Sequence, residues 1–187
     1  AKTKDFVTAV DEHSIILVKE LREKETMDEI EKIAKMISDT LSTELNIKVY
    51  ISIGTVVSDL KDVSRSYKEA KMALEVGKIF ESEKYIVNYE KLGIGRLIYQ
   101  LPLSLCKMFI KEVLHGLTMD DFDEETLATV NKFFENNLNV SETSRQLYIH
   151  RNTLVYRLDK LQKMTGLDLR NFDDAIIFKI TLMVSKY

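Results

Sequence analysis

The chain has little cysteine and lacks long apolar runs. With only Cys106 among 187 residues, an internal disulfide is excluded, and so low a cysteine content fits a reducing cytosol. No apolar run is long enough to span a bilayer, and the N-terminus lacks the hydrophobic segment of a signal peptide. These absences predict a cytoplasmic protein with no membrane partner.

The chain also lacks a basic surplus. Its net charge is −3, so affinity for nucleic acid has to come from a local patch rather than from a global field. Residues 138–166 provide such a patch, since they hold two anions and five cations: Arg145, Arg151, Arg157, Lys160 and Lys163. The three histidines are not clustered, and we expect neither a metal nor another cofactor.

Length and order of elements predict two different halves. A chain of 187 residues with 45% hydrophobic residues can form one large or two small packed domains. We expect an α+β domain with helices against a sheet over residues 1–98, followed by an all-α domain over residues 99–187. The boundary falls just before Pro102, which ends a short helix.

In the first half, two β-branched runs at 6–10 and 15–18 predict a hairpin, and Thr26 with Glu29 forms a capping box for a helix ending near Leu45. Further elements follow by their periodicity: a strand at 48–57, a helix at 60–79 with Tyr67 inward, and a strand at 85–89.

The second half contains helical patterns only. They predict helices at 103–117 with Leu105 buried, from the acid run at 120–125 to about 137, and from Asn171 or Asp173 to Tyr187 with Ile176 covering the neighbouring helices. The acid run would bind a metal only with ligand partners at a suitable spacing, and none is present. Acids that stabilise a helix start are the expected use.

Residues 141–164 are the motif core and predict two helices joined by a tight turn. The first helix covers 141–147 and Ser141 can cap it, whereas the second covers 151–164 and stops at Gly166. Apolar residues at helical spacing face inward: Val140, Leu147, Ile149, Leu154, Leu158 and Leu161. The turn residue Tyr148 stands where many such motifs have glycine, and since positive φ is costly for tyrosine, we expect a different turn geometry.

The outward face of the second helix has the side chains that a helix-turn-helix uses on double-stranded DNA in the major groove. They are His150, Arg151, Asn152, Thr153, Tyr156, Arg157 and Lys160.

Each of these side chains has an alternative use. Arg151 and Arg157 would bind phosphate or guanine, or remain on a solvated face. Asn152 would bind adenine or cap the helix, and the same cap is open to His150, whose other use is a phosphate contact. Arg145 and Lys160 are expected to be flanking phosphate contacts.

The roles of two further residues, Thr153 and Tyr156, also have two interpretations each. Thr153 would contact phosphate or pack its methyl group, and Tyr156 would lie on the DNA backbone or half in the core.

Three ordered segments carry a family resemblance. His150-Arg151-Asn152-Thr153-Leu154, then Tyr156-Arg157-Leu158, then residues 165–169 (TGLDL) resemble the C-terminal helix-turn-helix of the CdaR/PucR regulators of sugar-diacid and purine catabolism. The resemblance covers residues 115–187. It implies a bacterial sequence-specific DNA-binding regulator, of which this chain is a C-terminal fragment, with a small-molecule effector sensed by an upstream domain. Since one motif covers few base pairs, we expect a homodimer or tandem copies.

A second resemblance covers the first half. Ser52-Ile53-Gly54 and the helix at 67–78 are similar to the later part of a GGDEF domain, the fold of diguanylate cyclases. The cyclase signature then falls on residues 9–13, where Asp11 and Glu12 are kept but both glycines are lost, and a Cβ at each position obstructs nucleotide approach. The resemblance implies a degenerate domain without enzyme activity. The alternatives are a surviving cyclase and a nucleotide-binding or protein-interaction module.

Overall fold

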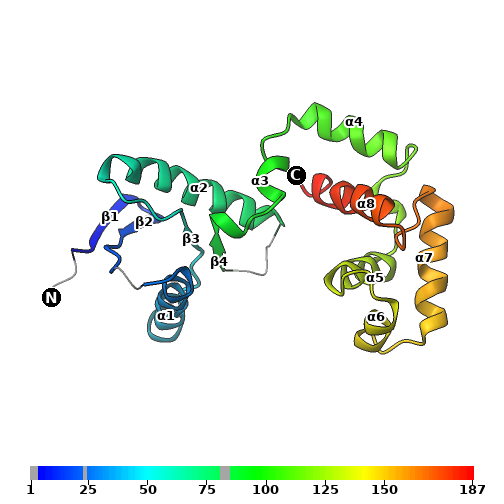
Figure 1. The fold of residues 1–187 in the computed structure, drawn as a ribbon, viewed down its shortest axis with the longest axis horizontal. Helices are drawn as coiled ribbons and strands as arrows, with labels where there is room; N and C mark the ends of the chain where they lie inside the picture. The colour runs from blue at the N-terminus through cyan, green and yellow to red at the C-terminus, as the bar shows by residue number, and fades with distance from the viewer. Residues whose placement is uncertain (1–3, 23–24, 81–84) are drawn as a thin grey trace.

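The computed structural model describes residues 4–22, 25–80 and 85–187, and it shows an elongated molecule (Figure 1). Two small sheets lie with α1 (Met27–Leu45) and α2 (Val63–Phe80) at one end. Five helices form the other end: α4 (Leu103–Val113), α5 (Glu124–Glu135), α6 (Val140–Gln146), α7 (Arg151–Thr165) and α8 (Phe172–Val184). The predicted fold class, α+β followed by all-α, is confirmed.

The sheets are two separate pairs of strands. β1 (Phe6–Asp11) and β2 (Ser14–Val18) form the predicted antiparallel hairpin. β3 (Ile51–Ile53) pairs in parallel with β4 (Ile86–Asn88). The strand predicted at residues 48–57 is wrong in length, because pairing with β4 extends over only three residues.

Helix α1 begins with the capping box that the sequence predicts. The Glu29 carboxylate accepts a hydrogen bond from the Thr26 backbone N–H at 2.8 Å, and the Thr26 side chain accepts one from the Glu29 backbone. Opposite β4, Glu31 accepts hydrogen bonds from Asn88 Nδ2 at 3.0 Å and from Lys91 Nζ at 2.7 Å. These contacts fix α1 against the end of the parallel pair.

Helix α2 packs through its small residues and not through Tyr67. Ala73, Val76 and Gly77 are buried, and Tyr67 is 37% exposed, so the predicted inward position of Tyr67 is wrong. A Cβ on Gly77 would lie 2.5 Å from Val87 Cγ2, which shows how closely β4 approaches this face. The side of α2 that packs against β4 is therefore the one that carries Gly77.

The helical end encloses the larger hydrophobic core. Its buried residues come from α5, α7, α8 and the segments that connect the helices: Leu114, Phe122, Val130, Phe133, Leu154, Leu158, Leu161, Leu169, Phe178 and Leu182. Two predicted core residues, Leu105 and Ile176, are wrong, since both are more than 40% exposed. Cys106 on α4 and Phe178 on α8 take the inward positions instead.

The acid run lies where α5 begins. A short 3₁₀ turn covers Met119–Asp121, and Asp123 then caps α5 by accepting a hydrogen bond from the Thr126 backbone N–H at 2.6 Å. The predicted role of these acids at a helix start is confirmed for Asp123.

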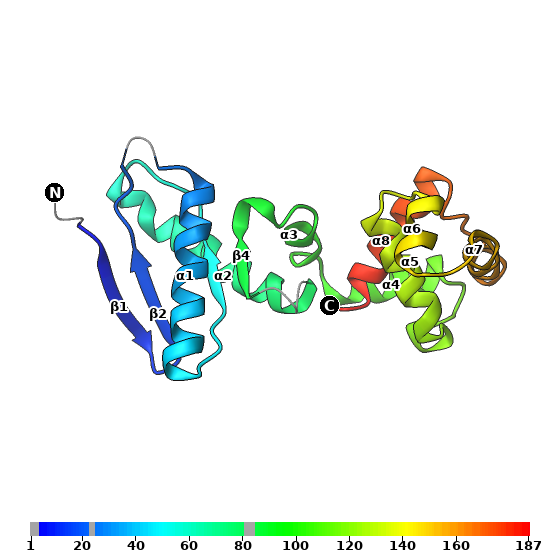
Figure 2. The same cartoon turned by 90° about the horizontal axis from the view of Figure 1, so that it is seen from below.

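The two ends of the molecule meet at α3 (Gly95–Ile98), which lies between them in both views (Figures 1 and 2). Ile98 is buried with Cys106 of α4 and Val184 of α8. The Tyr187 hydroxyl donates a hydrogen bond to the Tyr99 carbonyl oxygen at 3.0 Å. The last helix of the chain is therefore attached to the segment that follows the sheets.

The turn between α6 and α7 has the geometry of a glycine turn although tyrosine occupies it. Tyr148 has φ 54°, so the expected departure in turn geometry is wrong. Asn139, and not Ser141, caps α6, because its side chain accepts a hydrogen bond from the Glu142 backbone N–H at 3.0 Å. Gly166, with φ 79°, ends α7 as predicted.

Replacing Gly54 with alanine should lower the free energy of unfolding by about 1–3 kcal/mol, because the new Cβ overpacks a tight contact. That atom would lie 2.1 Å from the Ser66 carbonyl oxygen on α2. Urea unfolding followed by circular dichroism measures the loss. Gly95→Ala is the control, because Gly95 does not have a positive φ and its new Cβ would come no closer than 3.3 Å, to Val76 Cγ1. An equal or smaller loss for Gly54→Ala than for Gly95→Ala would contradict this account.

Replacing Tyr148 with glycine should raise the free energy of unfolding by about 1 kcal/mol. Relief of left-handed strain contributes about 1–2 kcal/mol, and the more flexible unfolded chain takes back about 0.4–1 kcal/mol. The ring is 96% exposed, so little packing is lost. Tyr148→Ala keeps the strain and should give no such gain in the same unfolding measurement. Equal stabilities of the two variants would contradict a strain of this size at Tyr148.

Candidate nucleic-acid interface

Helix α7 forms the outer end of the molecule, far from the sheets in both views (Figures 1 and 2). Leu154, Leu158 and Leu161 are buried in the core and fix the rotation of the helix about its axis. The opposite side begins with four consecutive exposed residues: His150, Arg151, Asn152 and Thr153. The first turn of α7 is therefore available to a partner.

His150 caps α7. Its Nδ1 atom accepts a hydrogen bond from the Asn152 backbone N–H at 3.2 Å. Of the two uses open to Asn152, the helix cap is thus taken by His150, and the Asn152 side chain is left exposed. The cap also satisfies one of the backbone donors that a helix start leaves without a partner.

Arg151 is an exposed cation beside the turn. Its Nη1 atom lies 3.4 Å from Ser141 Oγ, and no carboxylate in the described part of the chain forms an ion pair with it. A guanidinium with free donors can bind phosphate, or guanine in a bidentate manner.

Arg157 does not point outward, so its predicted placement is wrong. Its side chain is only 15% exposed, donates a hydrogen bond to Thr129 Oγ1 at 2.9 Å and forms an ion pair with Glu125. Position 157 is three residues after Leu154 and four before Leu161, at the edge of the buried stripe. From there the side chain reaches α5 instead of solvent.

Two flanking cations are exposed but paired. Lys160 Nζ lies 2.7 Å from an Asp123 carboxylate oxygen, and this ammonium, together with Thr126, holds the pKa of the Asp123 carboxyl well below its usual range. The same carboxylate raises the pKa of Lys160. Arg145 binds Glu142 through Nε at 3.0 Å and Nη2 at 2.6 Å.

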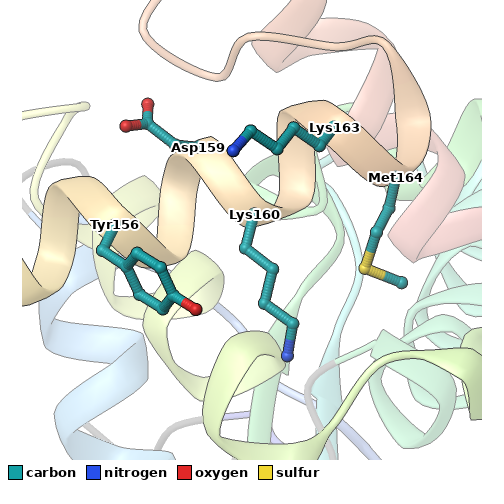
Figure 3. Close-up of a pocket in the computed structure, with 5 residues that line it drawn as sticks. All are labelled: Tyr156, Asp159, Lys160, Lys163 and Met164. Carbon is teal, nitrogen blue, oxygen red and sulfur yellow. The ribbon is translucent and has the colours of Figure 1, made fainter.

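A shallow hollow of about 280 Å³ follows the second half of α7 (Figure 3). It is lined by Tyr156, Asp159, Lys160, Lys163 and Met164. Tyr156 is 69% exposed, so it does not lie half in the core. Figure 3 shows Tyr156 and Lys160 extending to one side of the helix and Asp159 to the other.

Lys163 is the exposed cation that the site prediction omitted. It lies seven residues after Tyr156, two helical turns along the same side, and this spacing could have identified it. Lys163 therefore extends the exposed face toward the C-terminal end of α7.

Within residues 4–22, 25–80 and 85–187, no three His, Cys, Asp or Glu side chains gather as metal ligands. None of the helices in this part of the chain is long and apolar enough to cross a membrane.

Comparison with known proteins adds to this geometry. Residues 126–184 match the PucR C-terminal helix-turn-helix domain, and residues 1–76 match the GGDEF-like domain. Both regions correspond to the two resemblances found from the sequence.

Three curated relatives are similar to the chain. The purine catabolism regulatory protein of Bacillus subtilis is 28% identical over 147 residues, which cover 78% of this chain and 28% of the relative. The carbohydrate diacid regulator of Escherichia coli is 31% identical over 140 residues, which cover 75% of this chain and 36% of the relative. The proline-responsive transcriptional activator PutR of Bacillus subtilis is 26% identical over 188 residues, which cover 96% of this chain and 45% of the relative.

The chain thus spans less than half the length of each of these relatives. The names of all three relatives describe regulators, and the two matched domains occupy opposite ends of this chain. The chain belongs to the CdaR/PucR-type regulators, with a GGDEF-like domain followed by a PucR C-terminal helix-turn-helix domain.

Proposed function

We propose that this chain is the DNA-binding part of a transcriptional regulator and that α7 enters the major groove of double-stranded DNA. The observation that carries the proposal is the exposed first turn of α7, where Arg151 has no carboxylate partner in the described residues. A recognition helix contacts base edges with its N-terminal residues, which are the exposed ones here.

The side chains divide between base and phosphate contacts. Arg151 would bind guanine or phosphate and Asn152 adenine, while Thr153 and the His150 ring lie near the phosphates. Tyr156 would rest on the sugar-phosphate backbone.

Flanking cations complete the interface. Arg145, Lys160 and Lys163 would contribute salt-dependent affinity through phosphates. Arg157, held against α5, would act by fixing the position of the helix.

Further parts of the proposal concern the whole protein. A single motif covers few base pairs, so two copies of the chain would bind two half-sites as a homodimer in the cytoplasm. The effector would bind a domain outside this chain. We place the domain boundary between residues 98 and 99, directly after α3.

We further infer that the GGDEF-like domain makes no cyclic dinucleotide. The cyclase signature corresponds to the end of β1 and the following turn, where Ala9 and Val10 stand in place of glycines. The Asp11 carboxylate accepts a hydrogen bond from the His13 backbone N–H at 2.8 Å and so serves the turn. Any cyclic dinucleotide formed from GTP and magnesium by the purified chain would refute this inference.

Selection of bound sequences from a random duplex pool, with affinity followed against salt, tests the main proposal. An enriched palindrome or direct repeat supports base recognition, and its spacing gives the geometry of the two copies. A steep salt dependence without an enriched sequence would refute base recognition and leave only phosphate contacts. Absence of binding at low salt would favour a protein-docking module.

Replacing Arg151 with alanine should weaken binding to the selected sequence by about 1–3 kcal/mol, or roughly five- to 150-fold in Kd, if the guanidinium forms a bidentate contact with a base. Fluorescence anisotropy with labelled duplex measures the change. Arg22→Ala, with the same loss of charge in the N-terminal half, is the control and should leave Kd nearly unchanged. Equal affinities of the Arg151 and Arg22 variants would rule out the contact.

A further inference from the structure

The beginning of α5 places acids against α7. The Asp123 carboxylate lies 2.7 Å from Lys160 Nζ, and Glu125 forms an ion pair with Arg157. These partners are separated by 37 and 32 residues in sequence, so the pairs form only in the folded chain. Two of the cations that the sequence assigns to DNA are therefore neutralised from within the protein.

The two pairs differ in burial. The Lys160 and Asp123 side chains are 46% and 49% exposed, whereas the Arg157 side chain is 15% exposed and is also held by Thr129. Lys160 can therefore leave its partner by rotating its flexible stem, while Arg157 is fixed. The exchangeable pair is the one beside the hollow that also contains Tyr156 and Lys163 (Figure 3).

A lysine that is already ion-paired with a carboxylate adds little to the affinity for duplex DNA of arbitrary sequence. Affinity for duplex of arbitrary sequence comes from phosphate contacts that release counterions. A phosphate that binds Lys160 first has to displace the Asp123 carboxylate, which itself repels the phosphate. The net gain from this lysine is therefore smaller than that from an unpaired one, on every sequence.

We propose that Asp123 is an autoinhibitory residue, which restrains Lys160 in an ion pair and so lowers the affinity of α7 for duplex DNA of any sequence. The proposal rests on the function proposed above and concerns the regulation of that same surface. Base contacts from the first turn of α7 do not involve Lys160, so base recognition is retained while the affinity for phosphates falls on every duplex.

The decisive variant is Asp123→Asn. Asparagine is a preferred helix cap, so it can keep the hydrogen bond from the Thr126 backbone N–H while losing the charge that holds Lys160. Kd for a duplex of random sequence is measured between about 50 and about 200 mM salt. One extra phosphate contact steepens the slope of log affinity against log salt concentration by about 0.9. The loss of affinity between about 50 and about 200 mM salt therefore becomes about 3.5-fold larger.

Glu124→Gln is the matched control. It removes one negative charge from the adjacent position, and Glu124 has no ion pair in the described part of the chain. Its salt dependence should stay close to that of the unmodified chain. Equal steepening in both variants would mean a general charge effect and would overturn the proposal.

The Lys160→Gln background tests the mechanism. There Asp123→Asn should add no steepening, because the released cation is gone. Thermal unfolding of each variant checks that the fold is kept. If Asp123→Asn still steepens the salt dependence of binding when Lys160 is replaced, the proposal is overturned.

The outcomes separate the two proposals. If Arg151→Ala weakens binding to the selected sequence but Asp123→Asn matches the unmodified chain on random duplex, only this inference fails. If neither the unmodified chain nor Asp123→Asn binds any duplex, both proposals fail.

Discussion

The burial of one leucine stripe on α7 is the constraint on which the candidate interface depends. Leu154, Leu158 and Leu161 are almost fully buried among side chains of the other helices. Their burial favours folding and fixes the rotation of α7, and that rotation determines which side chains face outward. The Arg157 contacts with Thr129 and Glu125 add polar links between α7 and α5. The exposed first turn is thus held on a rigid support.

The turn before α7 shows how local chemistry completes this support. Asn139 and His150 each cap the helix that follows them, and Tyr148 adopts a conformation that glycine would take more easily. Only residues 147–150 separate α6 from α7, and this short connection leaves little freedom in the angle between the two helices. The N-terminal half is held less tightly, since β1 and β2 keep apolar side chains such as Phe6 and Ile15 more than 60% exposed.

The candidate site was predictable where it depended on neighbours in sequence. The span of α7 and its stop at Gly166 follow from helical spacing and glycine chemistry, and both agree with the structure. The direction of Arg157 was not predictable, because position 157 lies at the edge of the buried stripe. Whether such a side chain turns to solvent or to another helix depends on what stands opposite, and α5 provides Thr129 and Glu125 there.

The sequence by itself determined the order of elements, the capping box of α1, the hairpin and the helix-turn-helix, because each depends on contacts within a few residues. Only the tertiary structure decided that β3 pairs over three residues, that Gly77 and not Tyr67 faces β4, and that Asp123 holds Lys160. These features join segments far apart in the chain. Local spacing sets which face a helix offers, but the facing element decides which of its side chains are bound.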